Sequence, residues 1–495
     1  MFKKMGIHLM SYDVCIIGAG VVGCAIAREL SKYRLSICLI EKNEDVGAAT
    51  SKANSGIVHG GYADKPGTLK AQLCLAGNAL FDQLEQDLHF GFLRTGSFVV
   101  GFDELDRNKI MELLSQGQRN GVPGLQIINR AALFAKEPNL NQQIKWALHC
   151  PSAGVVSPYE FAIALAENAV HNGVTLKLNS LVTNLEQHEE YFKLTIANQP
   201  PLHSKIVINA AGLYTDDLAA LVGIDLPAIT PRAGQYLLFD RDEKKLVNGT
   251  IFQIPNAISK GILVTTTYHG NLLIGPDATM IGDKEYLDTT KNNIEEIIAA
   301  AKKILPSFDL RKVITSFAGN RASSPHHDFI IEESRNGFIN VAAIESPGLT
   351  ASPAIALRVV DLIKDTGINL AINDSFDPQR RPYKRIAAMS HDQLHNTITN
   401  DHRYGCVVCR CELVSRGEIS DALHREIPIN SLDAIKRRTR ASMGRCQGSF
   451  CTPKLMSIIS EELGIAKTAI TKKGGGSLLV TDSPTNLNTL KENKM

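Results

Sequence analysis

Short continuous hydrophobic runs alternate along this chain with longer stretches in which apolar residues recur at helical spacing. The first run ends at Ile17 and is followed by a glycine-rich turn and a helix-compatible stretch from Cys24. This order predicts a strand, a turn and a helix, which form the first half of a βαβ unit. A second buried strand is expected over residues 36–40, ending at Glu41.

The same two patterns continue to about residue 365. Helices are expected over 69–88, 157–171 and 351–363, and buried strands over 96–101, 206–212 and 337–343. Glycine-punctuated apolar runs between 232 and 277 predict strands and turns. The alternation predicts an α/β or α+β fold, and a chain of 495 residues is long enough for two or three domains.

Composition changes this picture little. A hydrophobic content of 44% with 21% charged residues is ordinary for a globular protein. The formal net charge of +2 gives no support to nucleic acid as a partner. Met1 to Met10 lacks the features of a secretory signal, and no transmembrane run follows. We expect a cytoplasmic protein whose membrane contact is at most peripheral, at the inner face.

The glycine-rich turn has the spacing of a dinucleotide-binding motif. Gly18 permits the tight turn, Gly20 admits a pyrophosphate to the backbone, and Gly23 lets the helix pack on the strand. Glu41, about twenty residues further on, is placed to accept hydrogen bonds from ribose hydroxyls. A plain turn and an ordinary strand-end charge are the alternatives.

Two later segments favour FAD over NAD. Small residues from Asn209 to Gly212 would let a cofactor pass close to the backbone. A turn at Gly348 comes directly before a helix, whose N-terminus could stabilise negative charge on a reduced flavin. Each segment could also be a plain turn.

Together with residues 53–61, Gly319 to Arg321 and 344–350, these segments resemble the D-amino-acid-oxidase-like superfamily of FAD oxidoreductases. Within it they are similar to FAD-dependent glycerol-3-phosphate dehydrogenases and L-2-hydroxyglutarate dehydrogenases. The resemblance implies these cofactor-binding residues: Gly18, Ala19, Gly20, Val21, Val22, Gly23, Glu41, Lys42, Ser51, Asn54, Ser55, Gly56, His59, Val182, Ala211, Gly212, Gly319, Arg321, Gly348, Leu349 and Thr350.

The resemblance also implies a Rossmann-like FAD-binding domain with an inserted mixed-sheet substrate domain. The expected FAD-binding segments are 10–75, 150–215 and 330–365, and the expected substrate segments are 76–149 and 216–329. A linker over 366–403, a small helical cysteine-cluster domain over 404–470 and a flexible tail over 471–495 are expected to follow.

The ten cysteines fall into two groups. Cys15, Cys24, Cys38, Cys74 and Cys150 lie in apolar sequence and are expected to be buried thiols. The C-terminal group offers four metal ligands in two close pairs, Cys409 with Cys411 and Cys446 with Cys451. Cys406 is then a spare thiol, and the alternative is that it is a ligand in place of Cys409. Spacing alone fits either zinc or an iron–sulfur cluster.

The C-terminal module is similar to the bacterioferritin-associated-ferredoxin-like (BFD-like) [2Fe–2S] domain, most closely to the version found in anaerobic glycerol-3-phosphate dehydrogenases. The shared segments are 409–419, 431–440 and 443–451. This likeness implies a [2Fe–2S] cluster on the four cysteines. We interpret the basic run 436–440 as a solvated helix face in preference to a partner-docking or cluster-tuning site.

Four side chains are candidates for chemistry on the substrate. His59 is the first candidate for the base that takes the hydroxyl proton, and His269 is the second. Arg321 has the planar fork that clamps a carboxylate or phosphate. Lys70 could add positive charge, but a helix-surface lysine is the simpler interpretation.

These observations predict an FAD-dependent dehydrogenase acting on a small anionic hydroxy-compound. Glycerol 3-phosphate is favoured over L-2-hydroxyglutarate, although the arginine that follows the histidine segment in the anaerobic glycerol-3-phosphate enzyme is missing from 60–64. The expected electron acceptor is a protein subunit or a quinone-linked partner. The alternatives are an electron-transfer subunit of a larger dehydrogenase and, less favoured, an NAD-linked reductase.

Overall fold

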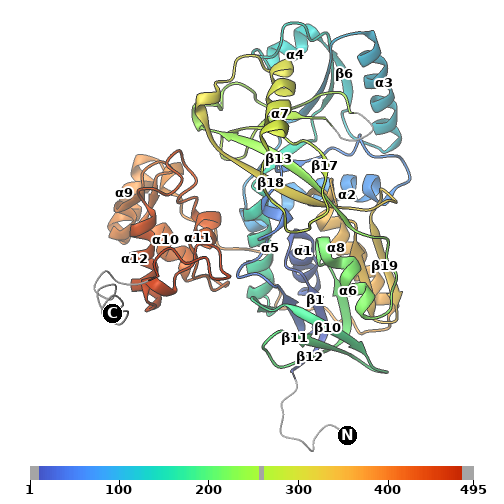
Figure 1. Ribbon diagram of the computed structural model, residues 1–495, viewed down its shortest axis with the longest axis vertical. Coiled ribbons are helices and arrows are strands. Elements are labelled where there is room, and N and C mark those ends of the chain that lie inside the picture. The colour runs from blue at the N-terminus through green and yellow to red at the C-terminus, as the bar shows by residue number, and fades with distance from the viewer. Residues whose placement is uncertain (1–9, 256–260, 482–495) are drawn as a thin grey trace, which may run out of the picture. The chain divides into compact units, whose positions relative to one another are not determined.

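The glycine-rich turn joins strand β1 (Met10–Ile17) to helix α1 (Val21–Leu30) in the computed structural model, which describes residues 10–255 and 261–481 (Figure 1). Strand β2 (Ile37–Ile40) pairs in parallel with β1, so the predicted βαβ opening is confirmed. The expectation for the N-terminal stretch falls on residues 1–9, which lie outside the described residues. The described chain divides into a larger unit, up to residue 42 and 46–380, and a smaller unit, 43–45 and 381 onward.

The first sheet of the larger unit has β1 at its centre. β1 pairs in parallel with β2 and with β12 (Leu202–Asn209). The two central strands, β1 and β12, are buried over most of their length, as in a sheet covered on two faces. β12 also pairs in parallel with β20 (Phe338–Ala342). The other strands are β9 (Thr175–Lys177), β10 (Val182–Gln187), β11 (Phe192–Ile196) and β19 (Ile330–Arg335).

Helices pack beside this sheet as the periodicity predicts. α1 contacts both α5 (Pro158–His171) and α8 (Gly348–Asp365), and α8 also contacts α2 (Leu69–Leu88) (Figure 1). The bounds of α2 match the expected helix. α8 begins three residues earlier than expected because the turn at Gly348 is already its first residue. α6 (Thr215–Leu221) follows β12.

The second sheet is mixed, with nine strands. Its centre is a long antiparallel pair of β13 (Thr230–Phe239) and β18 (Val313–Ser323), and its one parallel pairing among the described residues joins β14 (Thr250–Phe252) to β5 (Ser97–Gly101). The remaining strands are β6 (Gln126–Asn129), β7 (Trp146–Cys150), β15 (Leu263–Thr266), β16 (Leu272–Gly275) and β17 (Thr279–Met280). Apart from Cys150, the strands of both sheets fall within the ranges expected for the FAD-binding and substrate segments.

Helices α3 (Glu104–Arg119), α4 (Arg130–Lys136) and α7 (Lys291–Ile304) pack against the second sheet (Figure 1). Between the sheet and helices α4 and α7 lies an apolar core that includes Phe98, Phe239 and Ile297. Helix α3 packs in a separate core that includes Val99 and Ile110. A small third sheet joins β3 (Ile57–Val58), β8 (Gly154–Val156) and β4 (Phe92–Leu93). It holds the segment that leads to His59.

The smaller unit is helical, with a two-stranded ribbon. Its elements are α9 (His391–Asn400), β21 (Val407–Cys409), β22 (Val414–Ser415), α10 (Arg416–Leu423), α11 (Leu432–Thr439) and α12 (Thr452–Leu463). Arg437 and Arg438 of α11 are buried and both donate to the buried carboxylate of Asp45, at 2.6 and 2.8 Å. Our interpretation of the basic run as a solvated face is therefore wrong, because its arginines neutralise an internal acid.

Two further expectations need correction. The stretch 366–403 is no single linker: residues up to Arg380 belong to the larger unit, where Arg380 donates to buried Glu167, and the rest belongs to the smaller unit and includes α9. The first part of the expected flexible tail is ordered, since Thr471 bridges to Ser431. Residues 482–495 lie outside the described part of the chain.

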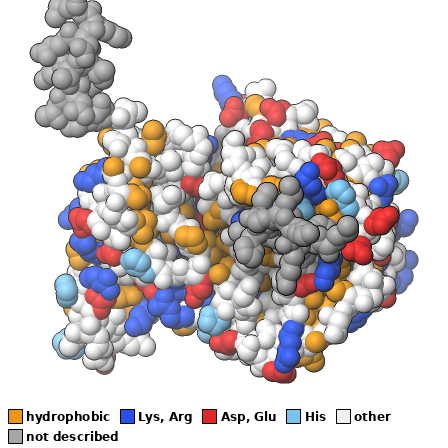
Figure 2. All heavy atoms as spheres, turned by 90° about the horizontal axis from the view of Figure 1, so that it is seen from below, with side chains coloured by type: hydrophobic (Ala, Val, Ile, Leu, Met, Phe, Trp, Pro, Cys, Tyr) orange, Lys and Arg blue, Asp and Glu red, His pale blue; other side chains and the backbone are white. Residues whose placement is uncertain are grey.

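Lysine, arginine, aspartate and glutamate side chains are interspersed over the face shown in Figure 2, in keeping with the nearly balanced formal charge. None of the helices in the described ranges combines the length and apolarity needed to cross a bilayer.

Candidate functional site

The main cavity of the larger unit, of about 400 Å³, runs from the glycine-rich turn to the second sheet. Its walls come from the start of α1, the segment before β3, strands β13 and β18 and the start of α8. The predicted residues that line it are Gly20, Val21, Val22, Ser51, Asn54, Ser55, His59, Gly212, Arg321, Gly348 and Leu349. The structure thus brings together side chains that lie far apart in the sequence.

Two glycines of the turn, Gly18 and Gly23, lie too close to neighbouring backbone to carry a side chain. A Cβ on Gly18, where φ is +104°, would lie 2.5 Å from the carbonyl oxygen of Ala210, and one on Gly23 would lie 1.9 Å from that of Gly18. Ser51 Oγ accepts a hydrogen bond from Val21 N, the first amide of α1. This bare backbone at a helix N-terminus fits the pyrophosphate of a dinucleotide such as FAD.

The other predicted cofactor residues do not line the cavity. Glu41 is buried, and its Oε2 accepts from Ala19 N at 2.9 Å, beside the turn. Lys42 instead pairs with Glu285 at 2.9 Å, and Val182 belongs to the core of the first sheet. The rest of this group are Gly18, Ala19, Gly23, Gly56, Ala211, Gly319 and Thr350. Their roles toward a cofactor stay predictions.

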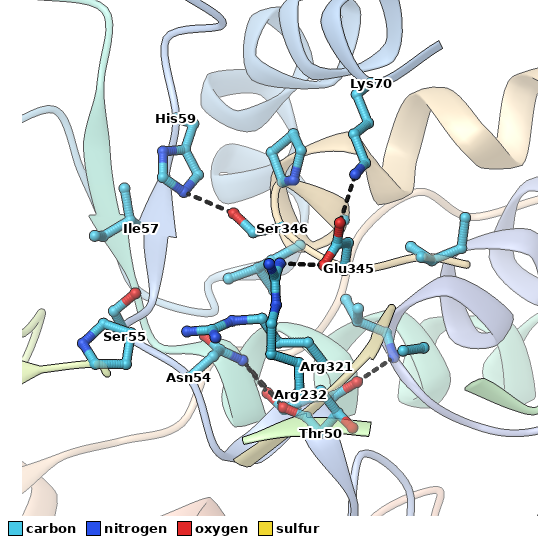
Figure 3. Close-up of a pocket in the computed structure, with 18 of the residues that line it drawn as sticks. Thr50, Asn54, Ser55, Ile57, His59, Lys70, Arg232, Arg321, Glu345 and Ser346 are labelled. Atoms are coloured by element: carbon cyan, nitrogen blue, oxygen red, sulfur yellow. Dashed lines mark hydrogen bonds and ion pairs between the residues drawn. The ribbon is translucent and has the colours of Figure 1, made fainter. Parts of the chain in front are cut away.

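His59 lies at the cavity wall and faces the start of α8 (Figure 3). Its Nε2 is 3.4 Å from Ser346 Oγ, and its backbone N–H donates to Thr350 Oγ1 at 2.9 Å. Asn78 Nδ2 also donates to the carbonyl of His59, at 2.8 Å. These contacts fix the backbone of His59 and turn its ring toward the cavity.

The structure does not bring His269 to this cavity. Its Nε2 contacts Glu160 Oε1 at 2.8 Å, and it stacks near Tyr159. Neither His269 nor Glu160 lines the cavity. Of the two candidate bases, the geometry therefore favours His59.

Two arginines face the cavity from neighbouring strands (Figure 3). Arg232 of β13 and Arg321 of β18 are direct cross-strand partners in the antiparallel register. Like charges placed opposite each other destabilise a sheet unless an anion compensates them. Such a pair at a cavity wall is suited to bind an anionic group, since each guanidinium presents several N–H donors.

A buried carboxylate lies beside this pair. Glu345 Oε1 accepts from Lys70 Nζ at 2.6 Å, and its other oxygen accepts from Arg232 (Figure 3). Burial raises the pKa of the Glu345 carboxyl, but the positive charges of Lys70, Arg232 and Arg321 lower it by more than burial raises it. The pKa of Glu345 therefore lies below its ordinary value. The simpler interpretation of Lys70 as a surface lysine is wrong, because its side chain is buried against Glu345 at the cavity.

Arg232 and Glu345 are charged cavity residues that we did not predict. Arg232 lies in an ordinary strand pattern and becomes recognisable only through its register with Arg321. Glu345 lies three residues before Gly348, inside a segment that was recognised, but its partner Lys70 is 275 residues away in the sequence. An isolated carboxylate beside a glycine-rich turn was the available signal.

In the smaller unit the four predicted ligand cysteines converge. The thiols of Cys409 and Cys451 interact, as do those of Cys411 and Cys446. A Cβ on Gly444 would lie 2.3 Å from Cys411 Cβ, so this glycine lets the second cysteine segment close on the first. Cys406 is exposed, and the five cysteines predicted to be core thiols are all buried.

The surroundings favour thiolates at Cys446 and Cys451. The Cys409 thiol, together with Ser442 Oγ at 3.3 Å, lowers the pKa of Cys451 to about 6 despite burial. Burial raises the pKa of Cys446, but the backbone N–H groups of Phe450 and Gly448 lower it below its usual value. Cys451 is also the N-cap of α12, a position that stabilises thiolate. The Cys451 thiol and burial raise the pKa of Cys409, and burial raises that of Cys411. Four neighbouring cysteines are nevertheless the usual ligand set of an iron–sulfur cluster.

Comparison with known families agrees with both sites. Residues 13–362 match the family described as FAD dependent oxidoreductase (DAO). Residues 407–461 match the BFD-like [2Fe-2S] binding domain.

Individual relatives extend this comparison. A glycerol 3-phosphate dehydrogenase of Caloramator mitchellensis is 45% identical over 95% of this chain and 98% of its own length. A glycerol 3-phosphate oxidase of Mycoplasma genitalium is 32% identical over 72% of this chain and 95% of its own. The human mitochondrial L-2-hydroxyglutarate dehydrogenase is 26% identical over 72% of this chain and 89% of its own.

Among solved structures, the dithionite-reduced L-α-glycerophosphate oxidase from Mycoplasma pneumoniae with FAD bound has a TM-score of 0.72 and 30% identity. It covers 76% of this chain and all of its own.

Proposed function

We propose that this chain, which belongs to the DAO family of FAD dependent oxidoreductases, oxidises sn-glycerol 3-phosphate to dihydroxyacetone phosphate. Its cofactors are FAD and a [2Fe–2S] cluster. The observation that carries the proposal is the cross-strand pair of Arg232 and Arg321 at a cavity that also contains His59. A phosphate held by the two guanidiniums would leave the carbinol of the substrate free to reach the histidine.

The residues of the chain divide the work as follows. Arg321 and Arg232 bind the phosphate and fix the orientation of the three-carbon chain, and Glu345 holds Arg232 in place. His59 is the general base, whose Nε2 takes the proton of the C2 hydroxyl. Ser346 Oγ orients the His59 ring. FAD, when bound, supplies the acceptor for the hydride that leaves C2.

Arg232 also compensates for an arginine that the sequence lacks near His59. Residues 60–64 lack the arginine that follows the histidine segment in the anaerobic glycerol-3-phosphate enzyme, which argued against phosphate recognition. Arg232 provides a second guanidinium from a different strand. The similarity to a glycerol 3-phosphate dehydrogenase along nearly the whole chain, cluster module included, supports the same substrate.

L-2-hydroxyglutarate is the second candidate. It is favoured by the likeness of the His59 segment to that branch and by Lys70, which could add to the binding of a second carboxylate. The lower identity to those relatives, and the smaller share of this chain that they match, make it the weaker candidate.

We further propose that electrons leave through the cluster of the smaller unit to a separate acceptor. The exposure of Cys411 and the partial exposure of Cys446 support this route, since an acceptor could approach the cluster at these two ligands. A chain that only relays electrons for another catalytic subunit is the competing possibility.

An anaerobic substrate screen tests the proposal. Loss of flavin absorbance is followed after adding sn-glycerol 3-phosphate, L-2-hydroxyglutarate, lactate or proline, and the product is identified. Rapid bleaching by glycerol 3-phosphate alone is the expected result. Bleaching by L-2-hydroxyglutarate would select the second candidate, and bleaching by none of them in the isolated chain would support the relay.

A further inference from the structure

One edge of the cysteine cluster is open to solvent and the other is not. Cys411 is exposed and Cys446 is half-buried, whereas Cys409 and Cys451 are buried. The shortest path for an electron between the cluster and the protein surface would therefore pass through Cys411 or Cys446.

Large apolar side chains flank that edge without being buried. Phe450, which precedes Cys451, is 81% exposed, and Leu413, two residues after Cys411, is 53% exposed. Val407 is exposed as well. Single exposed apolar residues need no explanation, but three within two residues of cluster ligands mark a surface suited to a partner.

The exposed charges of the two segments that carry the ligand cysteines have one sign. The two ligand-bearing segments, 406–413 and 443–454, carry the exposed cations Arg410, Arg445 and Lys454. Their one acid, Glu412, is buried and accepts from Arg440 at 2.8 Å. We call the exposed set formed by Val407, Arg410, Leu413, Arg445, Phe450 and Lys454 the cluster face.

We propose that the cluster face is the docking surface for a separate electron-accepting protein whose redox centre is surrounded by acidic residues. The inference rests on the proposed exit of electrons through the cluster and adds the surface and the charge of the partner. Opposite charges steer the encounter, and the apolar side chains exclude water where the two centres approach. A small patch of this kind fits a transient redox complex, whose interface is at the low end of the range for protein complexes.

A protein fits this face better than a membrane does. The cations lie beside the cluster ligands instead of along one side of an amphipathic helix. Three cations attract anionic lipid only weakly. Electron transfer also requires the acceptor to come close to the cluster edge.

The test uses the full chain with both cofactors, reduced photochemically so that the identity of the substrate does not affect the result. Stopped-flow mixing follows its oxidation by cytochrome b5, acidic around its haem, and by cytochrome c, basic around its haem. We expect the rate constant with cytochrome b5 to fall roughly tenfold between low and physiological salt, and that with cytochrome c to rise. The sign of the salt dependence does not depend on the driving force.

Charge reversal at each end of one helix provides the matched variants. Lys454 lies in the first turn of α12, and Lys467 is exposed and lies four residues after Leu463, the last residue of that helix. Arg410→Glu with Lys454→Glu should lower the rate with cytochrome b5 at least about tenfold, and Lys467→Glu should leave it unchanged. Phe450→Ser should lower it as well. Iron and sulfide contents confirm that the variants retain the cluster.

Three results would overturn the proposal. The first is a rate with cytochrome b5 that is insensitive to salt and to the double charge reversal. The second is that the double variant reduces its cluster from its own flavin more slowly but passes electrons to cytochrome b5 at an unchanged rate. That result would show that the cluster face serves electron transfer within the chain instead of a separate protein. The third is loss, in the double variant, of binding to vesicles of phosphatidylcholine and phosphatidylglycerol, which would assign the face to a membrane.

Discussion

The cavity of the larger unit and the interior of the smaller unit each hold one carboxylate between two cations, yet the two arrangements differ in exposure. Glu345 lies between Lys70 and Arg232, and the Arg232 side chain is 21% exposed at the cavity wall. Asp45 lies between Arg437 and Arg438, and the side chains of Asp45 and Arg438 are fully buried.

This difference separates two uses of the same ionic pattern. At the cavity, the carboxylate holds cations whose outer sides still face a site where an anion can bind, so the pattern prepares a binding surface. In the smaller unit, Asp45 neutralises Arg437 and Arg438 inside the protein, and these ion pairs hold helix α11 to residues 43–45. Substitutions should therefore change substrate kinetics at the first site and folding at the second.

The largest expected effect is on folding. Asp45→Asn leaves two buried arginines without a full counter-charge and should destabilise the smaller unit by about 3–5 kcal/mol. Denaturant unfolding, followed by loss of the cluster absorbance, measures this change. The matched variant Glu285→Gln removes an ion pair with Lys42 in which Glu285 is 67% exposed, and it should cost less than about 1 kcal/mol. Equal unfolding midpoints for Asp45→Asn and the unaltered chain would show that the buried triad has no structural role.

The second effect is on catalysis. Arg321→Met should lower kcat/KM for glycerol 3-phosphate roughly 10²- to 10³-fold, because a bidentate contact to the phosphate is lost. Arg321→Lys should recover only part of this, since an ammonium group lacks the planar fork. Arg311→Met is the control, because Arg311 is an exposed arginine in the turn before the same strand. An unchanged kcat/KM in Arg321→Met would remove Arg321 from the binding site.

The sequence predicted the glycine-rich turn and the neighbouring cysteine pairs better than the charged groups around them. The glycine-rich turn and the cysteine pairs are local patterns, and helix α2 was predicted with its observed bounds because its apolar spacing is local as well. The pairing of the two buried carboxylates with their cations gave no such local signal. Asp45 is 393 residues from Arg438 along the chain, and Glu345 is 275 from Lys70.

The same reason explains the two misread groups of cations. A lysine in the first turn of a helix and a run of arginines on another are usually solvated, because burying such charges is costly without partners. Each turned out to be buried because a distant acid neutralises it. Only the tertiary fold brings these partners together, whereas Arg232 required the sheet register.

The third effect is a dependence on pH at the buried triad. Burial raises the pKa of the Asp45 carboxyl, but Arg438 and Arg437 lower it from 3.8 to about 2. Because the folded-state pKa is the lower one, this stabilisation is fully present above pH 3.8 and is lost as the pH falls toward 2. It is on the order of 2 kcal/mol. Hydrogen exchange of α11 at decreasing pH should show the loss in the unaltered chain and not in Asp45→Asn. Parallel profiles would contradict the assignment.

The smallest effect should come from the carboxylate at the cavity. Glu345→Gln keeps the shape of the side chain but no longer neutralises Lys70 and Arg232, so Arg232 loses its fixed orientation while the cavity gains positive charge. We expect kcat/KM for glycerol 3-phosphate to fall about tenfold, or about 1.4 kcal/mol, and competitive inhibition by inorganic phosphate to become tighter. Adding Lys70→Met restores the charge balance and should reverse the gain in phosphate inhibition but not the loss of kcat/KM, a coupling that a double-mutant cycle measures. If phosphate inhibition weakens in Glu345→Gln, the carboxylate does not limit the positive charge of the cavity.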